Sequence, residues 1–301
     1  MRKFYTGLFF YFLFISSVFS QKRIVFIGVD GLGSRILSKA NTPVWDSLAS
    51  KGAYSYNFNA VLPTLSNPNW ASLLMGVSAY DHQIWDNKWR KSDFKEHSFC
   101  NQEKGITVPT IFKVMRERYP DQNIAVFHEW KEFTELIEYN ILTYSYHEKG
   151  NGLVLKASDY IVKEKPLLTF IHLDLVDKAG HTYGYRSIQY KTAVERADSL
   201  TGVIIKKMRE GNALDSTIFI ITSDHGFNGK GHGGRSKKLR EVPLIITGAG
   251  IPIGLRLPDK LHNYDLPVTL ASILNCNIPD CWKGEVIKAL LESSEKKTRL
   301  Q

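Results

Sequence analysis

Five short runs of residues are apolar at successive positions instead of at alternate ones. They are Arg23–Val29, Asn123–Phe127, Leu167–Leu173, Thr217–Thr222 and Pro243–Thr247. Strands of this kind are covered on both faces, as in a parallel sheet between helices. Stretches of helical period alternate with them: Thr42–Lys51, Asn69–Met75, Thr110–Tyr119, Gly152–Lys163, Ile188–Arg209 and Asp265–Leu274. The pattern predicts an α/β fold, doubly wound, with a mostly parallel central sheet between helix layers.

Polar side chains follow three of these strands at the point where each ends. Asp30 comes after the first strand, Asp174 and Asp177 after the third, and Asp224 and His225 after the fourth. Ligands of open parallel sheets bind beyond the carboxyl ends of the strands. We therefore expect these carboxylates and imidazoles to lie together at one edge of the sheet.

Composition narrows the class of protein. With 301 residues, 43% hydrophobic and 23% charged, the chain can bury a sizeable core, which excludes a disordered tail, a collagenous fibre and a disulfide miniprotein. The net charge is +9, or 9 − 2 = +7 without Arg2 and Lys3. The cations are spread along the chain with no basic block interleaved with aromatic residues, so no nucleic-acid groove is expected. The surplus of positive charge favours a small anionic ligand instead of a nucleic acid.

Residues 1–20 have the layout of an export signal. Arg2 and Lys3 precede an apolar run from about Leu8 to Val18, and the small residue Ser20 stands where a peptidase could cut. The alternative is an uncleaved anchor, and only then is membrane contact expected. In both cases the body of the protein is expected to be secreted, periplasmic or otherwise extracytoplasmic.

Three cysteines are compatible with an oxidising compartment. Cys276 and Cys281 could close a small loop as a disulfide, which would leave Cys100 unpaired. Free buried thiols are an equally good interpretation.

Carboxylate and imidazole groups recur in a pattern that suits metal ions. Asp177 and His181 stand four residues apart, Asp224 and His225 are adjacent, and His232 lies in a glycine-rich loop. Each cluster alone could be a turn cap or a surface histidine. Together with Asp30 they offer three Asp and three His, enough for two divalent cations, and Zn²⁺ is the expected ion because it accepts such nitrogen and oxygen ligands. Mn²⁺ or Fe would also tolerate the set.

Ser66 is the candidate nucleophile. It lies next to the start of a predicted helix, where backbone amides favour an anionic oxygen, and a neighbouring cation would lower the pKa of its hydroxyl. The competing interpretation is that Ser66 or Asn67 merely caps the helix.

Six motifs in order resemble the nucleotide pyrophosphatase/phosphodiesterase branch of the alkaline phosphatase superfamily. They are Gly28-Val29-Asp30-Gly31, Pro63 to Asn69, His82 to Asn87, Asp177 to Gly184, Ser223 to Gly226 and Gly231 to Gly234. The resemblance covers nearly all of residues 21–301 and implies one alkaline-phosphatase-like catalytic domain, with a small cap region around 88–160. It also implies a phosphate-ester substrate, such as a nucleotide or a lipid headgroup.

The same resemblance implies a role for each site residue. One cation would be held by Asp177, His181 and His232, and the other by Asp30, Asp224, His225 and the nucleophile Ser66. Asn87 would donate to a phosphoryl oxygen, which stabilises developing charge without adding a titrating group. The implied activity is metal-dependent hydrolysis of a phosphodiester through a covalent intermediate on Ser66.

Two departures from the family pattern keep alternatives open. The branch usually has threonine where Ser66 stands, and glycine where Gln83 stands. A phosphomonoesterase of the same superfamily is therefore an alternative, and a non-catalytic metal-binding module is another. Trp70 occupies the place of the arginine that sulfatases need, which argues against a sulfatase. Four aromatic residues could line a pocket, although packing in the core is the commoner role: Trp70, Trp85, Trp89 and Tyr183.

Overall fold

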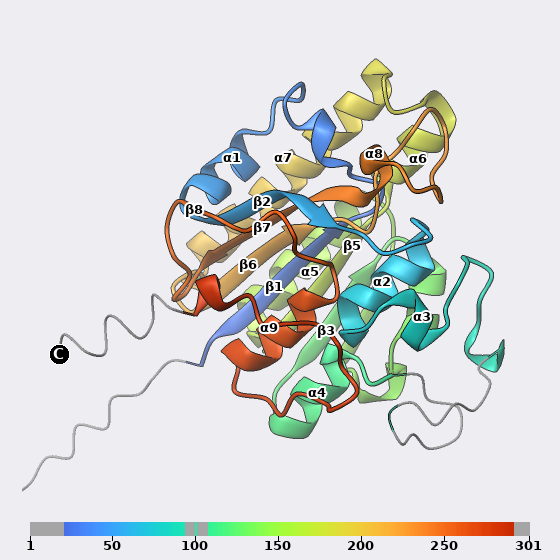
Figure 1. Cartoon of the computed structure of the whole chain (residues 1–301). Coiled ribbons are helices and arrows are strands. Elements are labelled where there is room, and N and C mark those ends of the chain that lie inside the picture. The colour runs from blue at the N-terminus through green and yellow to red at the C-terminus, as the bar shows by residue number, and fades with distance from the viewer. Residues whose placement is uncertain (1–20, 94–99, 101–107, 292–301) are drawn as a thin grey trace, which may run out of the picture.

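A central sheet organises the part of the chain that the computed structural model describes, residues 21–93, 100 and 108–291. Its strand order is β4-β3-β5-β1-β6-β7-β2-β8 (Figure 1). The strands are β1 (Arg23–Val29), β2 (Gly52–Asn59), β3 (Ile124–His128), β4 (Tyr144–His147), β5 (Leu168–Leu173), β6 (Thr217–Thr222), β7 (Glu241–Gly248) and β8 (Leu255–Arg256). From β4 to β6 all neighbours are parallel, and β7 is antiparallel to β6 and β2.

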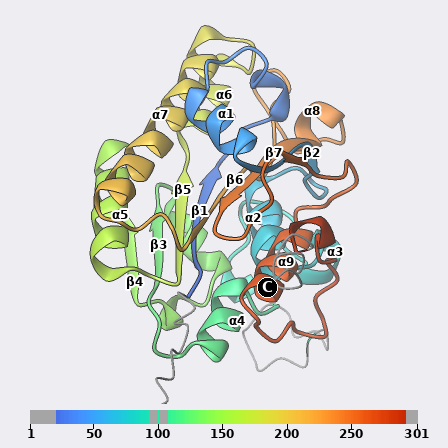
Figure 2. The same cartoon turned by 90° about the vertical axis from the view of Figure 1, so that its left-hand side faces the viewer.

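Helices cover both faces of this sheet. They are α1 (Pro43–Ser50), α2 (Ser66–Met75), α3 (Ala79–His82), α4 (Ile111–Arg118), α5 (Asn151–Glu164), α6 (Leu175–Tyr183), α7 (Ile188–Glu210), α8 (Lys237–Arg240) and α9 (Asp265–Ile273). Figure 2 shows α5 and α7 on one side of the sheet and α2, α4 and α9 on the other. Along β1, Ile24 and Phe26 join the core beneath α2, α4 and α9, whereas Val25 and Ile27 join the core beneath α1, α5 and α7. The predicted α/β fold, with a mostly parallel sheet between helix layers, is confirmed.

Several elements differ from the sequence-based prediction. Strands β2, β4 and β8 were not predicted, because β2 alternates apolar with polar residues, β4 is only partly buried and β8 has two residues. Helix α6 was not predicted either, since charged and glycine residues break its apolar pattern. Helix α2 begins at Ser66, three residues before the predicted start, so Ser66 lies in its first turn.

The predicted cap region, around 88–160, is partly integrated into the main fold. Strands β3 and β4 lie within it and belong to the central sheet, and α4 and most of α5 lie in the helix layers. The division into a catalytic domain and a cap stays a prediction. The predicted export signal, residues 1–20, lies outside the described residues. Within the described residues, no helix combines the length and apolar character needed to cross a membrane.

Of the two interpretations that the sequence left open for the cysteines, the pairing of Cys276 with Cys281 is wrong, and the free buried thiol holds for Cys276 alone. Cys281 forms a disulfide with Cys100, and their Cα atoms are 5.1 Å apart. Cys276 is a free, buried thiol just after α9, packed in the core. Proximity in sequence does not determine which way a side chain points. Here the turn between α9 and Cys281 directs one thiol inward and the other toward Cys100.

Candidate active site

The predicted site residues converge at the carboxyl ends of the parallel strands. Asp30 follows β1, helix α6 follows β5 and carries Asp177 and His181, and β6 runs into Asp224 and His225. His232 returns to the same edge from the loop between β6 and α8. Because β1 lies between β5 and β6, these segments are neighbours although they are far apart in sequence.

Ser66 faces this cluster from the start of α2. Its Oγ lies 3.2 Å from Nε2 of His225 and 3.5 Å from Nδ2 of Asn87. The N-cap residue is Leu65, and no side chain caps the helix. Capping therefore does not account for Ser66, whose hydroxyl is directed into the site at the positive end of the helix dipole.

Asn87 is held in one orientation by the backbone of α2. Its Oδ1 accepts a hydrogen bond of 2.9 Å from the backbone N–H of Asn67. The amide Nδ2 is consequently the atom that faces Ser66. An N–H donor thus lies beside the hydroxyl oxygen, where a bound phosphoryl oxygen could accept from it.

Two groups of side chains could each hold a metal ion. Asp177, His181 and His232 form one, and Asp30, Asp177 and His225 form the other, with ligand atoms within 4.8 Å of one another in each group. Asp224 adjoins the second group, since its Oδ2 lies 3.2 Å from Nε2 of His225. Of the six predicted ligands and Ser66, none lies away from the cluster.

The three histidines are oriented as ligands. Each turns its Nδ1 toward a backbone carbonyl oxygen: His225 toward Gly226 at 3.2 Å, His181 toward Lys230 at 3.0 Å and His232 toward Thr64 at 3.0 Å. A carbonyl can only accept, so Nδ1 carries the proton and Nε2 is left with a lone pair. The Nε2 atoms of His181 and His232 lie 3.0 Å apart, and a cation between them would relieve the repulsion of two facing lone pairs.

Asp30 and Asp224 show a similar arrangement, with one carboxylate oxygen held by hydrogen bonds and the other without a hydrogen-bond partner. Oδ2 of Asp30 accepts from Trp70 Nε1 at 3.0 Å and from His172 Nε2 at 3.1 Å. Oδ1 of Asp224 accepts from the backbone N–H of Gly31 at 3.0 Å. The buried atoms Asp30 Oδ1, Asp224 Oδ2 and Asp177 Oδ1 have no hydrogen-bond partner. Buried polar atoms are rarely left unpaired, so these residues fit divalent cations.

The pKa shifts of the clustered carboxyl and imidazole groups also suit bound cations. Burial, followed by the charges of Asp30 and Asp174, raises the pKa of Asp177 to about 9, and burial next to Asp30 also raises the pKa of Asp224. Burial alone would raise the pKa of Asp30, but the hydrogen bond from His172 and the neighbouring imidazoles outweigh it and the pKa is lowered. Burial lowers the pKa of His225 to about 3 and also lowers the pKa of His232. Neutral imidazoles beside crowded carboxyl groups suit a cation.

The pocket over the site includes residues that the sequence analysis did not single out. Its volume is about 410 Å³, and Trp130, Glu132 and Lys178 line it beside the predicted residues and Arg90. His172 was also missed, although a histidine within the apolar strand β5 was a visible signal. Of the four aromatic candidates, Trp70 and Trp89 are buried in the core and Trp85 is exposed. Tyr183 lines a neighbouring pocket.

Comparison with known proteins places this chain in a family. Residues 24–232 match the model of the type I phosphodiesterase / nucleotide pyrophosphatase family. The chain belongs to this family. The resemblance to this branch of the alkaline phosphatase superfamily, inferred from six motifs, is thereby confirmed, and the matched span includes every predicted site residue.

Two curated relatives are much longer than the chain. GPI ethanolamine phosphate transferase 1 of Saccharomyces cerevisiae is 27% identical over 224 residues, which cover 70% of the chain and 24% of the relative. Human ectonucleotide pyrophosphatase/phosphodiesterase family member 1 is 26% identical over 257 residues, which cover 79% of the chain and 27% of the relative. The chain therefore spans about a quarter of the length of these relatives.

Solved structures share the fold. Human ectonucleotide pyrophosphatase / phosphodiesterase 5 superimposes with a TM-score of 0.71 at 15% identity, covering 88% of the chain and 97% of that protein. A phosphonate monoester hydrolase from Silicibacter pomeroyi superimposes with a TM-score of 0.64 at 14% identity, covering 89% of the chain and 76% of that protein. The central sheet and its helix layers are thus those of alkaline-phosphatase-like enzymes.

Proposed function

We propose that this chain is a metal-dependent hydrolase of phosphodiesters that uses Ser66 as its nucleophile. The observation that carries the proposal is the position of Ser66 Oγ, between Nε2 of His225 and Nδ2 of Asn87 at the start of α2. The family and the character of its curated relatives, one of which is a pyrophosphatase/phosphodiesterase, support a phosphate ester as the substrate.

In the proposed reaction, Ser66 Oγ gives up its proton to solvent and forms a bond to phosphorus, while the leaving oxygen departs from the opposite side and takes up a proton. Asn87 Nδ2 donates to a non-bridging oxygen, and the positive end of the α2 dipole favours the negative charge there. Water then replaces Ser66 Oγ on phosphorus and the free hydroxyl is restored.

Two divalent cations, most simply Zn²⁺, are part of the proposal. Asp30, Asp224, His225 and Ser66 would hold one, and Asp177, His181 and His232 the other. When bound, such ions neutralise phosphoryl oxygens and lower the pKa of hydroxyl groups and water. The unpaired carboxylate oxygens and the facing Nε2 atoms support this assignment.

The test compares bis-p-nitrophenyl phosphate with p-nitrophenyl phosphate as substrates of the zinc-loaded protein. We expect faster turnover of the diester, and a loss of about a thousandfold or more in kcat for Ser66→Ala. Ser158→Ala is the matched control for folding, because Ser158 is a buried serine of α5 whose Oγ donates to the carbonyl of Val154, away from the site. Near-normal turnover by metal-loaded Ser66→Ala would show that the covalent step is wrong.

Two other results would replace the proposal. Preference for the monoester would make the chain a phosphomonoesterase. Absence of both stoichiometric metal and turnover would indicate a non-catalytic module. Because one relative is an ethanolamine phosphate transferase, products should also be analysed with ethanolamine present, and transfer exceeding hydrolysis would favour a transferase.

We also propose an extracytoplasmic location. The disulfide between Cys100 and Cys281 is the kind of bond that persists in oxidising compartments, and residues 1–20 have the composition of an export signal. Fractionation of cells that express the full chain tests this, and recovery of the protein in the cytosol with reduced thiols would contradict it.

A further inference from the structure

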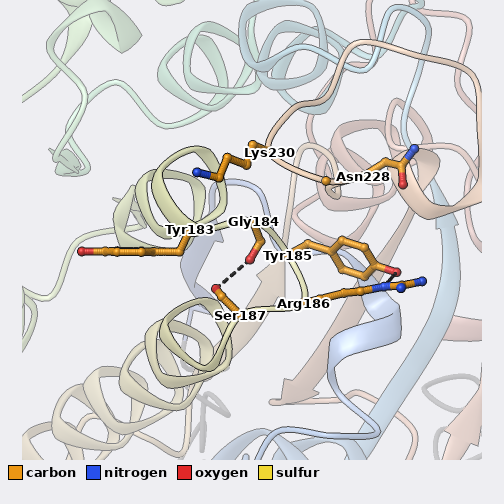
Figure 3. Close-up of a pocket in the computed structure, with 8 residues that line it drawn as sticks. Tyr183, Gly184, Tyr185, Arg186, Ser187, Asn228 and Lys230 are labelled. Atoms are coloured by element: carbon orange, nitrogen blue, oxygen red, sulfur yellow. Dashed lines mark hydrogen bonds between the residues drawn. The ribbon is translucent and has the colours of Figure 1, made fainter.

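Besides its histidines, the candidate active-site pocket is lined by two basic residues, Arg90 and Lys178. Lys178 forms an ion pair with Asp174, which lines the same pocket, so a carboxylate balances its charge. Arg90 has no ion pair among the residues that the structure describes. Arg186 and Lys230 line a neighbouring pocket, which shares no lining residue with this one (Figure 3). Of the two basic residues in the active-site pocket, Arg90 is therefore the one whose charge is not balanced by a carboxylate.

The guanidinium of Arg90 is fixed next to Asn87. Its Nη1 donates to the carbonyl of Asn87 at 3.2 Å and to the carbonyl of Trp89 at 2.9 Å. Nδ2 of the same asparagine lies 3.5 Å from Oγ of Ser66. Arg90, Asn87 and Ser66 all line the pocket of about 410 Å³. A phosphoryl group bound at Ser66 and Asn87 therefore lies in the same confined space as the guanidinium.

The backbone on both sides of Arg90 is also held in place. Oδ1 of Asp86 accepts a hydrogen bond of 3.0 Å from the backbone N–H of Trp89. Lys91 Nζ donates to the carbonyl of Ile137 at 2.6 Å. A side chain that is fixed in advance loses less freedom when it binds a ligand, so Arg90 is well prepared for an anion.

One edge of the guanidinium is open. Nε and Nη2 of Arg90 have no hydrogen-bond partner among the described residues, in contrast to Nη1. Glu132 lines the same pocket, but within the described part of the chain no ion pair joins its carboxylate to Arg90. The parallel N–H groups of Nε and Nη2 match two oxygens of a phosphoryl group in spacing and direction.

We propose that Arg90 is a further substrate-binding residue, which binds the phosphoryl group beside Asn87 through Nε and Nη2. Asn87 supplies a neutral donor, whereas Arg90 adds a positive charge that deprotonation does not remove. The inference rests on the proposed function, because it assigns Arg90 to the same phosphoryl group that Ser66 would attack. Inorganic phosphate is a suitable probe, since it presents the same kind of non-bridging oxygens.

The experiment measures calorimetric binding of inorganic phosphate to zinc-loaded Ser66→Ala, which needs no turnover. Adding Arg90→Gln should raise the dissociation constant by about tenfold or more, because a hydrogen bond from a charged donor contributes more than one from a neutral donor. The matched control is Arg118→Gln in the same background. Arg118 lies on α4, outside the pocket, and its Nε donates to the carbonyl of Asn275 at 3.2 Å. The control should leave the dissociation constant unchanged.

A double-mutant cycle separates direct contact from an effect through Asn87. Because Nη1 of Arg90 also holds the carbonyl of Asn87, loss of the guanidinium would weaken binding if it merely displaced that amide. In that case Arg90→Gln would have no effect once Asn87→Ala has removed the amide. We expect instead that Arg90→Gln raises the dissociation constant by about tenfold in the presence of Asn87→Ala as well.

Two results would overturn the inference: an unchanged dissociation constant for Arg90→Gln, or a loss of binding that disappears when Asn87→Ala is present. Turnover assays with Ser66 intact keep its failure distinct from that of the proposed function. Phosphate binding that depends on Arg90, in a protein that hydrolyses no phosphate ester, would keep this phosphate ligand and reject the hydrolase. Hydrolysis by a protein whose phosphate binding does not depend on Arg90 would keep the hydrolase and reject the role of Arg90.

Discussion

Gly28 and Trp70 share one space in the core. A Cβ atom placed on Gly28 would lie 2.5 Å from Cη2 of Trp70, closer than such atoms approach. Only glycine at this point of β1 leaves room for the indole beside the strand. The position of the indole also affects the site, because Nε1 of Trp70 donates to Oδ2 of Asp30, two residues beyond Gly28.

From the hydrogen bond between Trp70 and Asp30 we predict that Trp70→Phe lowers the affinity for Zn²⁺ strongly and the free energy of unfolding only modestly. The substitution keeps most of the apolar volume but removes the N–H that orients Asp30. Loss of a hydrogen-bond partner of a metal ligand typically lowers the metal affinity by about 10- to 100-fold. Competition with a chromogenic chelator measures the affinity. The control is Trp45→Phe, which removes the buried hydrogen bond from Trp45 Nε1 to Thr201 on the other face of the sheet. Equal zinc affinities for the two variants would contradict the assigned role of Trp70.

Removal of metal should destabilise the protein. Asp30, Asp177 and Asp224 are crowded together, and burial with neighbouring carboxylates raises the pKa of Asp177 to about 9. Zn²⁺ at about a hundred times its dissociation constant should add about 2.7 kcal/mol to the free energy of unfolding. Thermal unfolding of protein dialysed against EDTA, with and without added Zn²⁺, measures this. Mg²⁺ at the same concentration is the control, because it prefers oxygen ligands. An identical midpoint under all three conditions would refute the metal site.

Acid should destabilise the fold through His82, which connects α2 to the segment that carries Asn87. Ile84 N–H donates to Nδ1 of His82 at 3.0 Å, and Nε2 lies 3.1 Å from both Ser72 Oγ and the carbonyl of Pro68. A proton on Nδ1 would break the bond from Ile84. Burial above all lowers the pKa of His82 from 6.5 to about 4.

The sign follows from this lowered pKa. Between pH 6.5 and 4 the unfolded chain binds a proton that the folded protein does not, so stability is full above pH 6.5 and falls as the pH is lowered. At pH 5 the loss through His82 is about 2 kcal/mol. Urea unfolding at pH 7.5 and pH 5 gives the loss of stability for wild type and for His82→Gln. The difference between the two losses is the contribution of His82, because the other titrating groups are the same in both proteins. A pH dependence as steep in the variant as in the wild type would show that His82 is not responsible.

The disulfide between Cys100 and Cys281 should contribute substantially to stability. It joins segments 181 residues apart, and loss of a native disulfide typically costs about 2–5 kcal/mol. Cys281→Ser should therefore unfold at a lower temperature than wild type, and a reductant should lower the midpoint of wild type but not of the variant. Thiol titration of the unreduced, unfolded protein should find one free thiol, that of Cys276. Three free thiols would contradict this pairing.

Much of the site could be predicted from the sequence because its residues follow strands. Asp30, Asp224 and His225 come directly after apolar runs, and any parallel sheet brings such positions to one edge. Ser66 was identifiable for a similar reason, since it starts a helix. The contacts of His172 and Trp70 with Asp30 could not be predicted in this way, because they join three different elements of the fold.

The order of apolar runs and helical stretches by itself determined the layered α/β fold, because burial on both faces leaves few other arrangements for such strands. The same order brought Asp30, Asp224 and His225 to one edge of the sheet. Only the tertiary structure decided which cysteine pairs with Cys281 and which carboxylate oxygen of Asp30 and of Asp224 is free. Those features depend on side-chain direction and on contacts between distant segments, which a linear pattern of hydrophobic and polar residues does not specify.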